Sequence, residues 1–510
     1  MQAVHPQTTR ASDEKTSDID VPAGYQPRDG DVEGHKVGHL VTRDHINDGY
    51  DPAFLKKTMR RIDFRLVPIL AALYAVSLID RTNISLARAA GMGASLGLNR
   101  PGSQEYSYAV LAFFPTYIVF ELPSNIGMRK FGAPIWLGGA TFLWGIVMTM
   151  MGLSRNADHL IAMRAILGIF EAALFPGAVY LLSSWYLRHE VQKRVSIFYS
   201  FSVFASGLSA IIAYGLAQIK MYPVERRLVG TRGYLGEGWR SIFFLEGIAT
   251  VILGVVGFFT LVSFPEQAKF LTPEQKAMVA ARIDMDRADA TPDKLTLKKT
   301  GKYAMDPVLA SFAVQFFSAT LGSYSLSYFL PQILAGMGFS GALSQILVFP
   351  PYAFALPIII ACGYFSDRTR TRTPFIAFAF LLLIIGTVLY TYVRSVGARY
   401  FGVMLAVAGC NTAVPLVAGF SQISIRKASK RSFTSALVVA AGGLGGIASG
   451  LAFTQKQAPH YSTGVHLTLA MASISIAITL IQTLYFRFQN RKADRGELVI
   501  EDHADFRRQL

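Results

Sequence analysis

Long apolar runs alternate with short polar segments along most of this 510-residue chain. An α-helix needs about 20 apolar residues to cross the hydrocarbon core of a bilayer, so each run predicts one membrane-spanning helix. An even number of spans predicts that both termini lie on the same side of the membrane. We place twelve spans near residues 64–88, 106–127, 134–154, 158–187, 195–219, 241–264, 308–332, 342–365, 373–394, 399–422, 433–454 and 466–488.

A long polar segment from Glu266 to Met305 separates the spans into two sets of six. Within it, Thr272 and Gln275 form a capping-box pattern around Pro273, which predicts an amphipathic surface helix. The fold class is therefore an all-α membrane protein of two six-helix halves, which resembles the major facilitator fold. The predicted parts are a disordered cytoplasmic N-terminal tail (1–60), the first half (61–265), a cytoplasmic linker (266–305), the second half (306–488) and a cytoplasmic C-terminal tail (489–510).

Composition supports a membrane protein. Hydrophobic residues make up 52% of the chain and the mean hydropathy is +0.36, too apolar for one soluble domain. The net charge of +16 comes from Lys and Arg in short clusters between the apolar runs rather than along one stripe. This pattern favours cytoplasmic loops over a nucleic-acid surface and predicts that both termini are cytoplasmic. We expect a multi-pass, monomeric protein of the cell membrane without a cleaved signal peptide.

Five ionisable residues lie inside the spans of the first half: Asp80, Arg81, Glu121, Arg164 and Glu171. Each charged side chain at mid-membrane costs about 2.5–3.5 kcal/mol on insertion scales. Such residues are tolerated where they meet one another, water or a ligand. The sequence therefore predicts a polar cavity inside the first half.

Spacing brings some of these groups onto shared helix faces. Arg164 and Glu171 are seven residues apart, so they share a face with roughly 10 Å between them along the helix axis. Tyr117 and Glu121 are four apart and also share a face. A guanidinium can bind a carboxylate through two hydrogen bonds, and a desolvated acid can load and release a proton. The set suits an anionic substrate that moves together with protons.

Three motifs carry a family resemblance. They are Asp80-Arg81-Thr82-Asn83-Ile84, the run from Tyr117 to Asn125, and Arg164 to Glu171 followed by Phe175-Pro176-Gly177. They resemble the anion:cation symporter family of the major facilitator superfamily, whose fungal branch contains allantoate and nicotinate-type permeases. A further segment, Gly363 to Arg372, resembles the superfamily's cytoplasmic loop.

The resemblance implies roles for individual residues. Arg81 would bind the substrate carboxylate, and Arg164 would contact the substrate and tune Glu171. Tyr117 and Asn411 would be further substrate contacts. The proton carriers would be Asp80, Glu171 and Glu121. Gly363, Asp367 and Arg368 would form a conformational latch on the inward side. Leu78 stands where bacterial relatives carry a tyrosine, which leaves the substrate open.

Structural interpretations accompany each role. Asp80 with Arg81, and Arg164 with Glu171, could be buried pairs that fix helix packing. Glu121 could be a structural hydrogen-bonding group, and we interpret Glu246 as structural.

The candidate functions are proton-coupled uptake of a small organic anion, proton-antiport efflux of a metabolite or drug, and a non-transporting nutrient sensor. No cofactor or metal pattern is present in the sequence, so we expect no enzyme. The string from Gly443 to Ala448 resembles a dinucleotide motif, but glycines at every fourth residue of an apolar span indicate close helix packing.

Overall fold

The structure is a computed structural model. It describes residues 50–98, 105–188, 190–219, 237–287, 296–339, 341–453, 457, 461–501 and 506–510. Residues 1–49, which the sequence predicts to be disordered, lie outside the described residues. Most of the long loop between the fifth and sixth spans also lies outside them.

α1 begins at Pro52, capped by the Asp51 carboxylate, which accepts from the backbone N–H groups of Ala53 and Phe54. The predicted tail of residues 1–60 was therefore too long by nine helical residues.

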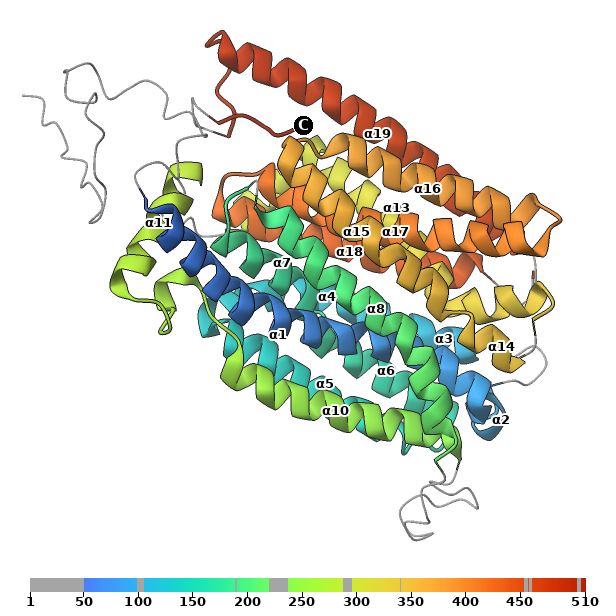
Figure 1. Cartoon of the computed structure of the whole chain (residues 1–510). Helices are drawn as coiled ribbons and strands as arrows, with labels where there is room; N and C mark the ends of the chain where they lie inside the picture. Colours follow the sequence, from blue (N-terminus) through green and yellow to red (C-terminus); the bar gives the residue numbers. More distant parts are fainter. Residues whose placement is uncertain are drawn as a thin grey trace, which may run out of the picture.

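Helices of the first half run from α1 to α10 (Figure 1). By composition and length, ten helices in the described part of the chain can cross a membrane, or twelve if each of two bent pairs counts as one span. The twelve expected spans are thus confirmed. The first six comprise α1 (Pro52–Ala87), α3 (Glu105–Leu111) with α4 (Phe113–Phe131), η2 (Pro134–Gly138) with α5 (Gly139–Met151), α6 (Ala157–Glu171) with α7 (Leu174–Trp185), α8 (Val191–Ala217) and α10 (Gly238–Thr260). Two short elements, η1 (Arg88–Met92) and α2 (Gly93–Ser95), follow α1.

The second half repeats the pattern after the linker. The 3₁₀ turn η3 (Pro265–Gln267) and α11 (Pro273–Arg287) lie in the linker, where the Thr272 and Gln275 side chains each accept from the other's backbone N–H. The remaining elements are α12 (Leu297–Ala304), α13 (Pro307–Gly336), α14 (Gly341–Ile346) with α15 (Phe349–Thr369), α16 (Thr373–Tyr392), α17 (Val396–Ile423), α18 (Ala428–Ala452) and α19 (Ser462–Asp494).

The two halves meet along two helix pairs, α8 with α15 and α4 with α18. Glycines allow the close approach at both. A Cβ on Gly207 would lie 2.7 Å from the Cβ of Tyr352, and one on Gly446 would lie within 2.2 Å of the Phe114 ring. The glycines of α18 therefore serve helix packing, as the sequence predicted. Among the described residues, eight helices surround the centre of the bundle at this interface: α1, α4, α7, α8, α13, α15, α17 and α18.

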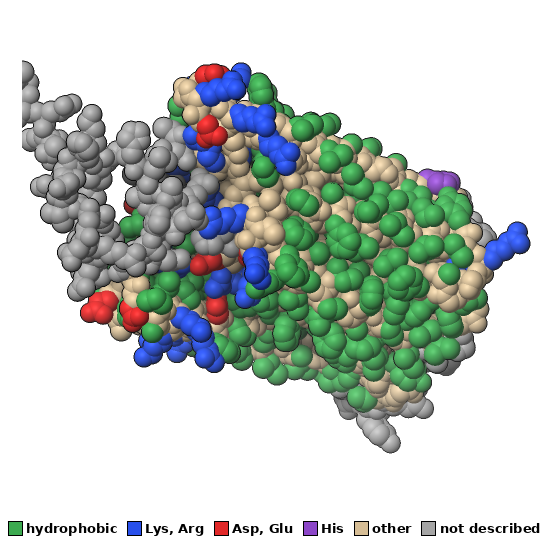
Figure 2. Space-filling model, turned by 45° about the horizontal axis from the view of Figure 1, so that its top comes forward, with side chains coloured by type: hydrophobic (Ala, Val, Ile, Leu, Met, Phe, Trp, Pro, Cys, Tyr) green, Lys and Arg blue, Asp and Glu red, His purple; other side chains and the backbone are tan. Residues whose placement is uncertain are grey.

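Charged side chains gather at one end of the molecule, and a broad apolar belt covers its sides (Figure 2). The start of α1 lies at the charged end, because Asp63 is ion-paired with Arg194 at the start of α8. The last residues lie there too. The side-chain amide of Asn490 in α19 donates to the backbone carbonyl of Arg508 and accepts from its backbone N–H, and the carbonyl of Leu510 accepts from the backbone N–H of Arg372. α19 extends to Asp494, so the predicted tail from residue 489 begins as helix and ends packed against the bundle.

Candidate functional site

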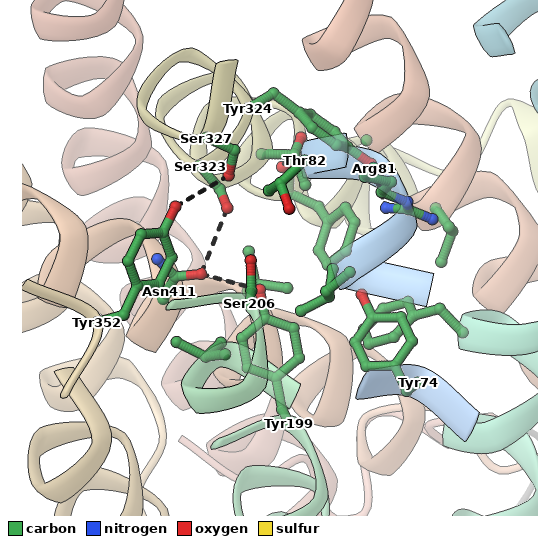
Figure 3. A pocket seen from close by; sticks show the side chains of 18 of the residues that line it. Tyr74, Arg81, Thr82, Tyr199, Ser206, Ser323, Tyr324, Ser327, Tyr352 and Asn411 are labelled. Carbon is green, nitrogen blue, oxygen red and sulfur yellow. Dashed lines mark hydrogen bonds between the residues drawn. The ribbon is translucent and has the colours of Figure 1, made fainter. Parts of the chain in front are cut away.

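A small cavity lies between the two halves (Figure 3). α1, α4, α7 and α8 line it from the first half, and α13, α15, α17 and α18 line it from the second. The cavity measures about 40 Å³, room for roughly three water molecules, since one needs about 10–15 Å³. The two halves therefore leave little free space between them beside Arg81. Its main polar wall consists of Tyr74, Arg81, Thr82, Tyr117, Tyr199, Ser206, Ser323, Tyr324, Ser327, Tyr352 and Asn411.

Arg81 occupies the centre of this wall and uses all its nitrogens. Its Nε donates to Glu171 Oε1 at 2.6 Å, Nη1 donates to the Tyr324 hydroxyl at 2.6 Å, and Nη2 donates to the Tyr117 hydroxyl at 3.3 Å. The rings of Tyr117 and Tyr324 also lie within 6 Å of the guanidinium carbon, a distance typical of cation–π contact. The guanidinium of α1 is thus held by residues of α4, α6 and α13. Its hydrogen bond to Tyr324 joins the two halves.

Within the described residues, the cavity wall carries a positive charge and no negative charge. Arg81 is the one charged residue among those that line the cavity. Glu171 lies behind it, fully buried, and also accepts from the Ser77 hydroxyl at 2.6 Å. The cavity therefore presents a positive group whose counter-charge is held in the protein behind it.

The opposite wall consists of neutral hydroxyl and amide groups. Asn411 Oδ1 accepts from the hydroxyls of Tyr199 and Ser323, both at 3.3 Å, and Ser327 is bonded to the Tyr352 hydroxyl at 3.2 Å. These groups come from α8, α13, α15 and α17, and Figure 3 shows them facing Arg81 across the cavity. A ligand in the cavity would meet a cation on one side and hydrogen-bonding groups on the other.

Asp80 does not face the cavity. Its carboxylate points towards α5 and α10, where Oδ2 accepts from Trp144 Nε1 at 2.9 Å and from the Thr250 hydroxyl at 3.4 Å. Successive residues of an α-helix point about 100° apart, so Asp80 and Arg81 cannot share one direction. The sequence placed both in one cavity, and the structure separates them.

Arg164 and Glu121 also lie outside the cavity lining. Arg164 is fully buried and its Nε donates to the Ala109 carbonyl at 3.4 Å. The partner of Glu171 is Arg81 rather than the predicted Arg164, because α1 approaches Glu171 directly while Arg164 lies two turns away on the same helix. Glu121 is buried, and neither carboxyl oxygen has a hydrogen-bond partner among the described residues.

The loop after α15 joins the two halves at the charged end. Asp367 accepts from the backbone N–H of Lys193 at 2.6 Å and is ion-paired with Arg372 at 2.5 Å. Gly363 packs against Ser196 of α8 so closely that a Cβ would lie 2.3 Å from its hydroxyl. Arg368 is exposed, so the arginine that pairs with Asp367 is Arg372. Burial lowers the pKa of Arg372, and its ion pair with Asp367 opposes that shift.

Sequence reasoning missed most of the tyrosines of the cavity, including Tyr74, Tyr324 and Tyr352. One signal was available. The seventh apolar run contains the hydroxyl-rich stretch from Ser323 to Tyr328, with five hydroxyl side chains in six residues. Such a density of hydroxyl groups is unusual in a lipid-facing helix. Tyr74 and Tyr352 carry no comparable signal, because a single tyrosine in an apolar span is common.

Two six-helix halves that close around a central polar cavity define a membrane transport protein rather than an enzyme. The chain belongs to the Major Facilitator Superfamily, whose family description matches residues 70–450. Among its relatives, the MFS-type transporter cnsO of Penicillium expansum is 30% identical, over 90% of this chain and 88% of its own length. The high-affinity nicotinic acid transporter of Saccharomyces cerevisiae is 27% identical, over 86% of this chain and 79% of its own.

Solved structures show the same fold. The xylose transporter XylE from E. coli, in a partially occluded inward-open conformation, superimposes with a TM-score of 0.61 at 11% identity. The match covers 82% of this chain and 97% of XylE. The chain is therefore a multi-pass secondary transporter of small molecules, as its family and fold require.

Proposed function

We propose that the protein carries a small organic anion across the membrane together with protons, by alternating access. The observation that supports this most directly is the single guanidinium of Arg81 in an otherwise neutral cavity. A carboxylate can accept two hydrogen bonds from a guanidinium, and burial strengthens such a pair. The tyrosine and Asn411 hydrogen-bonding groups opposite would orient the remainder of the anion. Tyr117 would assist Arg81, with which it is already bonded.

The ion pair of Arg81 with Glu171 supplies a route to proton coupling. While Glu171 is ionised, it occupies Arg81 Nε. A proton on Glu171 would remove its negative charge, and the substrate carboxylate would then supply the counter-charge that Arg81 needs. One proton and one anion enter together, so the net charge of the buried site stays constant. This exchange avoids an unpaired buried charge, which would cost several kcal/mol.

Similarity to a nicotinic acid transporter is consistent with a carboxylate substrate. Nicotinate is a flat aromatic acid, and the cavity offers aromatic rings beside Arg81. Tyr117 and Tyr324 lie against the guanidinium, and Phe114 stacks edge-on against Tyr324. The fungal branch of the anion:cation symporters that the sequence resembles would fit this chemistry. We therefore favour aromatic and small aliphatic monocarboxylates as the first compounds to test.

Orientation follows from the charge distribution. Lys and Arg gather at the end that holds the start of α1 and the last residues (Figure 2). Positive residues favour the cytoplasmic side of membrane proteins. We place that end, and both termini, in the cytoplasm, with the Asp367 loop as the inward latch of a cell-membrane transporter. The protein would act as a monomer, since one chain supplies every helix around the cavity.

The test is uptake of labelled nicotinate by vesicles that contain the full-length protein, with and without an inward proton gradient. Uptake should rise with the gradient, and Arg81→Ala should lower it at least tenfold, because hydrogen bonds to charged groups contribute about 1.5–3 kcal/mol. Arg487→Ala, an exposed arginine of α19, is the matched control. A panel of unlabelled acids would define the substrate by competition. Equal uptake by the parent and Arg81→Ala would contradict the proposal, and gradient-driven extrusion would support efflux instead.

A further inference from the structure

A second polar cluster lies behind α1, on the side away from the substrate cavity. Asn83 Nδ2 donates a hydrogen bond to Glu246 Oε2 of α10. Asn83 is fully buried and Glu246 is 8% exposed. The other oxygen of each side chain, Asn83 Oδ1 and Glu246 Oε1, is buried and has no hydrogen-bond partner among the described residues. The two side chains are therefore joined by one hydrogen bond, and each has one buried oxygen that accepts no hydrogen bond from the described residues.

Both unused atoms are oxygens, so no rearrangement of the present hydrogen atoms can pair them. One added proton on Glu246 Oε1 would pair both, because a carboxylic acid and a primary amide form two hydrogen bonds in a ring: the amide N–H to one carboxyl oxygen, and the carboxyl O–H to the amide oxygen. A buried polar atom without a hydrogen-bond partner destabilises the folded state, so the added proton would remove two such destabilising contributions.

We propose that Glu246 is a proton-binding site outside the substrate cavity, and that in this conformation one proton bridges Glu246 Oε1 and Asn83 Oδ1. No metal, cofactor or substrate is needed to form it. The proton comes from water, and the carboxyl group changes from anion to neutral acid when it binds.

The charges around the pair favour this assignment. Among the described residues, neither Asp80 nor Glu246 forms an ion pair with Lys, Arg or His. α5, η2 and the part of α8 beyond Arg194 contain no charged residue, and α10 itself contributes only Arg240, which donates to the carbonyls of Gly152 and Ser154. In η1, Arg88 lies over the ring of Tyr106. On α1, the charged residues beyond Arg65 are Asp80 and Arg81, and Arg81 is paired with Glu171.

The proton is assigned to Glu246 rather than to Asp80 because the two carboxyl groups have different hydrogen-bond donors. Asn83 also donates to Asp80 Oδ1, at 3.5 Å, so one amide connects both carboxyl groups. Two ionised carboxylates this close, without a cation, repel each other strongly. Asp80 accepts from Trp144 and Thr250 as well, and these donors stabilise its ionised form. Glu246 has Asn83 alone as its side-chain donor, so the neutral form is favoured there.

The pair is connected to the substrate site through α1. Asp80 and Asn83 flank Arg81 and Thr82, both of which line the cavity. Loss of the Glu246 proton would place a second anion beside Asp80 and would weaken the contact of α1 with α10. A link between this proton and transport rests on the function proposed above, whereas the proton site itself does not.

Infrared spectroscopy tests the site without any substrate. The full-length protein in lipid should show the carbonyl stretch of protonated carboxylic acids at neutral pH, a band that ionised carboxylates and amides lack. Glu246→Gln should remove the area of one carboxyl group from this band. Glutamine can keep both hydrogen bonds to Asn83, so the variant should remain folded. Glu237→Gln, in the segment before α10, is the matched control and should leave the band unchanged.

Asn83→Ala is the second variant. It removes the amide partner but keeps the acid, so the band component should shift position rather than disappear. The proposal is overturned if Glu246→Gln and the parent give the same band, or if the component appears only when sodium is replaced by a large organic cation, which would mean that sodium occupies the site. Vesicle uptake measured on the same samples separates the two proposals: absent uptake with an intact Glu246 component would contradict only the transport function.

Discussion

Arg81 of α1 and Glu171 of α6 form a buried ion pair with 2.6 Å between Nε and Oε1. Removal of one partner of a buried pair leaves an uncompensated charge that costs about 3–5 kcal/mol, whereas neutralisation by a proton leaves the partner free to bind another anion. The pair is thus suited to exchange one counter-charge for another.

Glu171→Gln should separate transport from the proton gradient. Glutamine cannot gain or lose a proton, so Arg81 would remain available to the substrate at every pH. We expect exchange of labelled for unlabelled nicotinate across vesicles to persist, while accumulation driven by a proton gradient is lost. Ser77→Ala removes a neighbouring hydrogen bond without removing the acid and is the control. Full gradient-driven accumulation by Glu171→Gln would exclude Glu171 as the proton carrier.

Tyr324→Phe should weaken substrate binding. The variant removes the 2.6 Å bond that holds Arg81 Nη1 and leaves the ring in place. A hydrogen bond to a charged group contributes about 1.5–3 kcal/mol, so the KM for uptake should rise roughly tenfold or more. Tyr117→Phe removes a longer, 3.3 Å bond to the same guanidinium and should have the smaller effect. The reverse order would show that the second half does not position Arg81.

Gly446→Ala should disfavour the close approach of the two halves seen in this structure. A Cβ at this position would lie 2.1 Å from a carbon of the Phe114 ring, which packs against Tyr324 across the interface of the two halves. The ring would have to move, so α4 and α18 should separate more readily. Labelling of a cysteine introduced at an interface position should become faster. Gly450→Ala is the milder control, because its Cβ would meet only the end of the Leu111 side chain at 3.0 Å.

Stability should fall in acid through Asp306, which caps α13. Burial raises its pKa, but the hydrogen bond and charge of Lys430 outweigh burial and hold the pKa below the ordinary value. A lowered folded-state pKa gives a stability contribution that is present above the unfolded pKa of about 3.9 and is lost as pH falls through the folded pKa. The Tm of the parent should therefore drop more steeply below about pH 4 than that of Asp306→Asn, which keeps a capping side chain. Parallel curves would contradict this role of Asp306.

Hydropathy alone predicted the architecture, because each span must satisfy its own backbone hydrogen bonds and therefore appears as a continuous apolar run. Among the charged residues that the sequence assigned to one cavity, the structure brings Arg81 and Glu171 into contact, and Arg81 lines the cavity. Asp80 points towards α5 and α10 instead, and the shared helix face of Arg164 and Glu171 does not bring these two side chains into contact. Which helix approaches Glu171 depends on the packing of α1 against α6 and α7, and no local pattern in the sequence contains that information.

The small size of the cavity has a consequence for inhibitors. Any compound larger than a few water molecules can reach Arg81 only while the two halves are apart. A carboxylic acid with a bulky substituent could bind the guanidinium and yet be too large to enclose, and it would then hold the protein open and stop turnover instead of being carried. Size limits of this kind would distinguish cargo from blocker among acids of equal affinity.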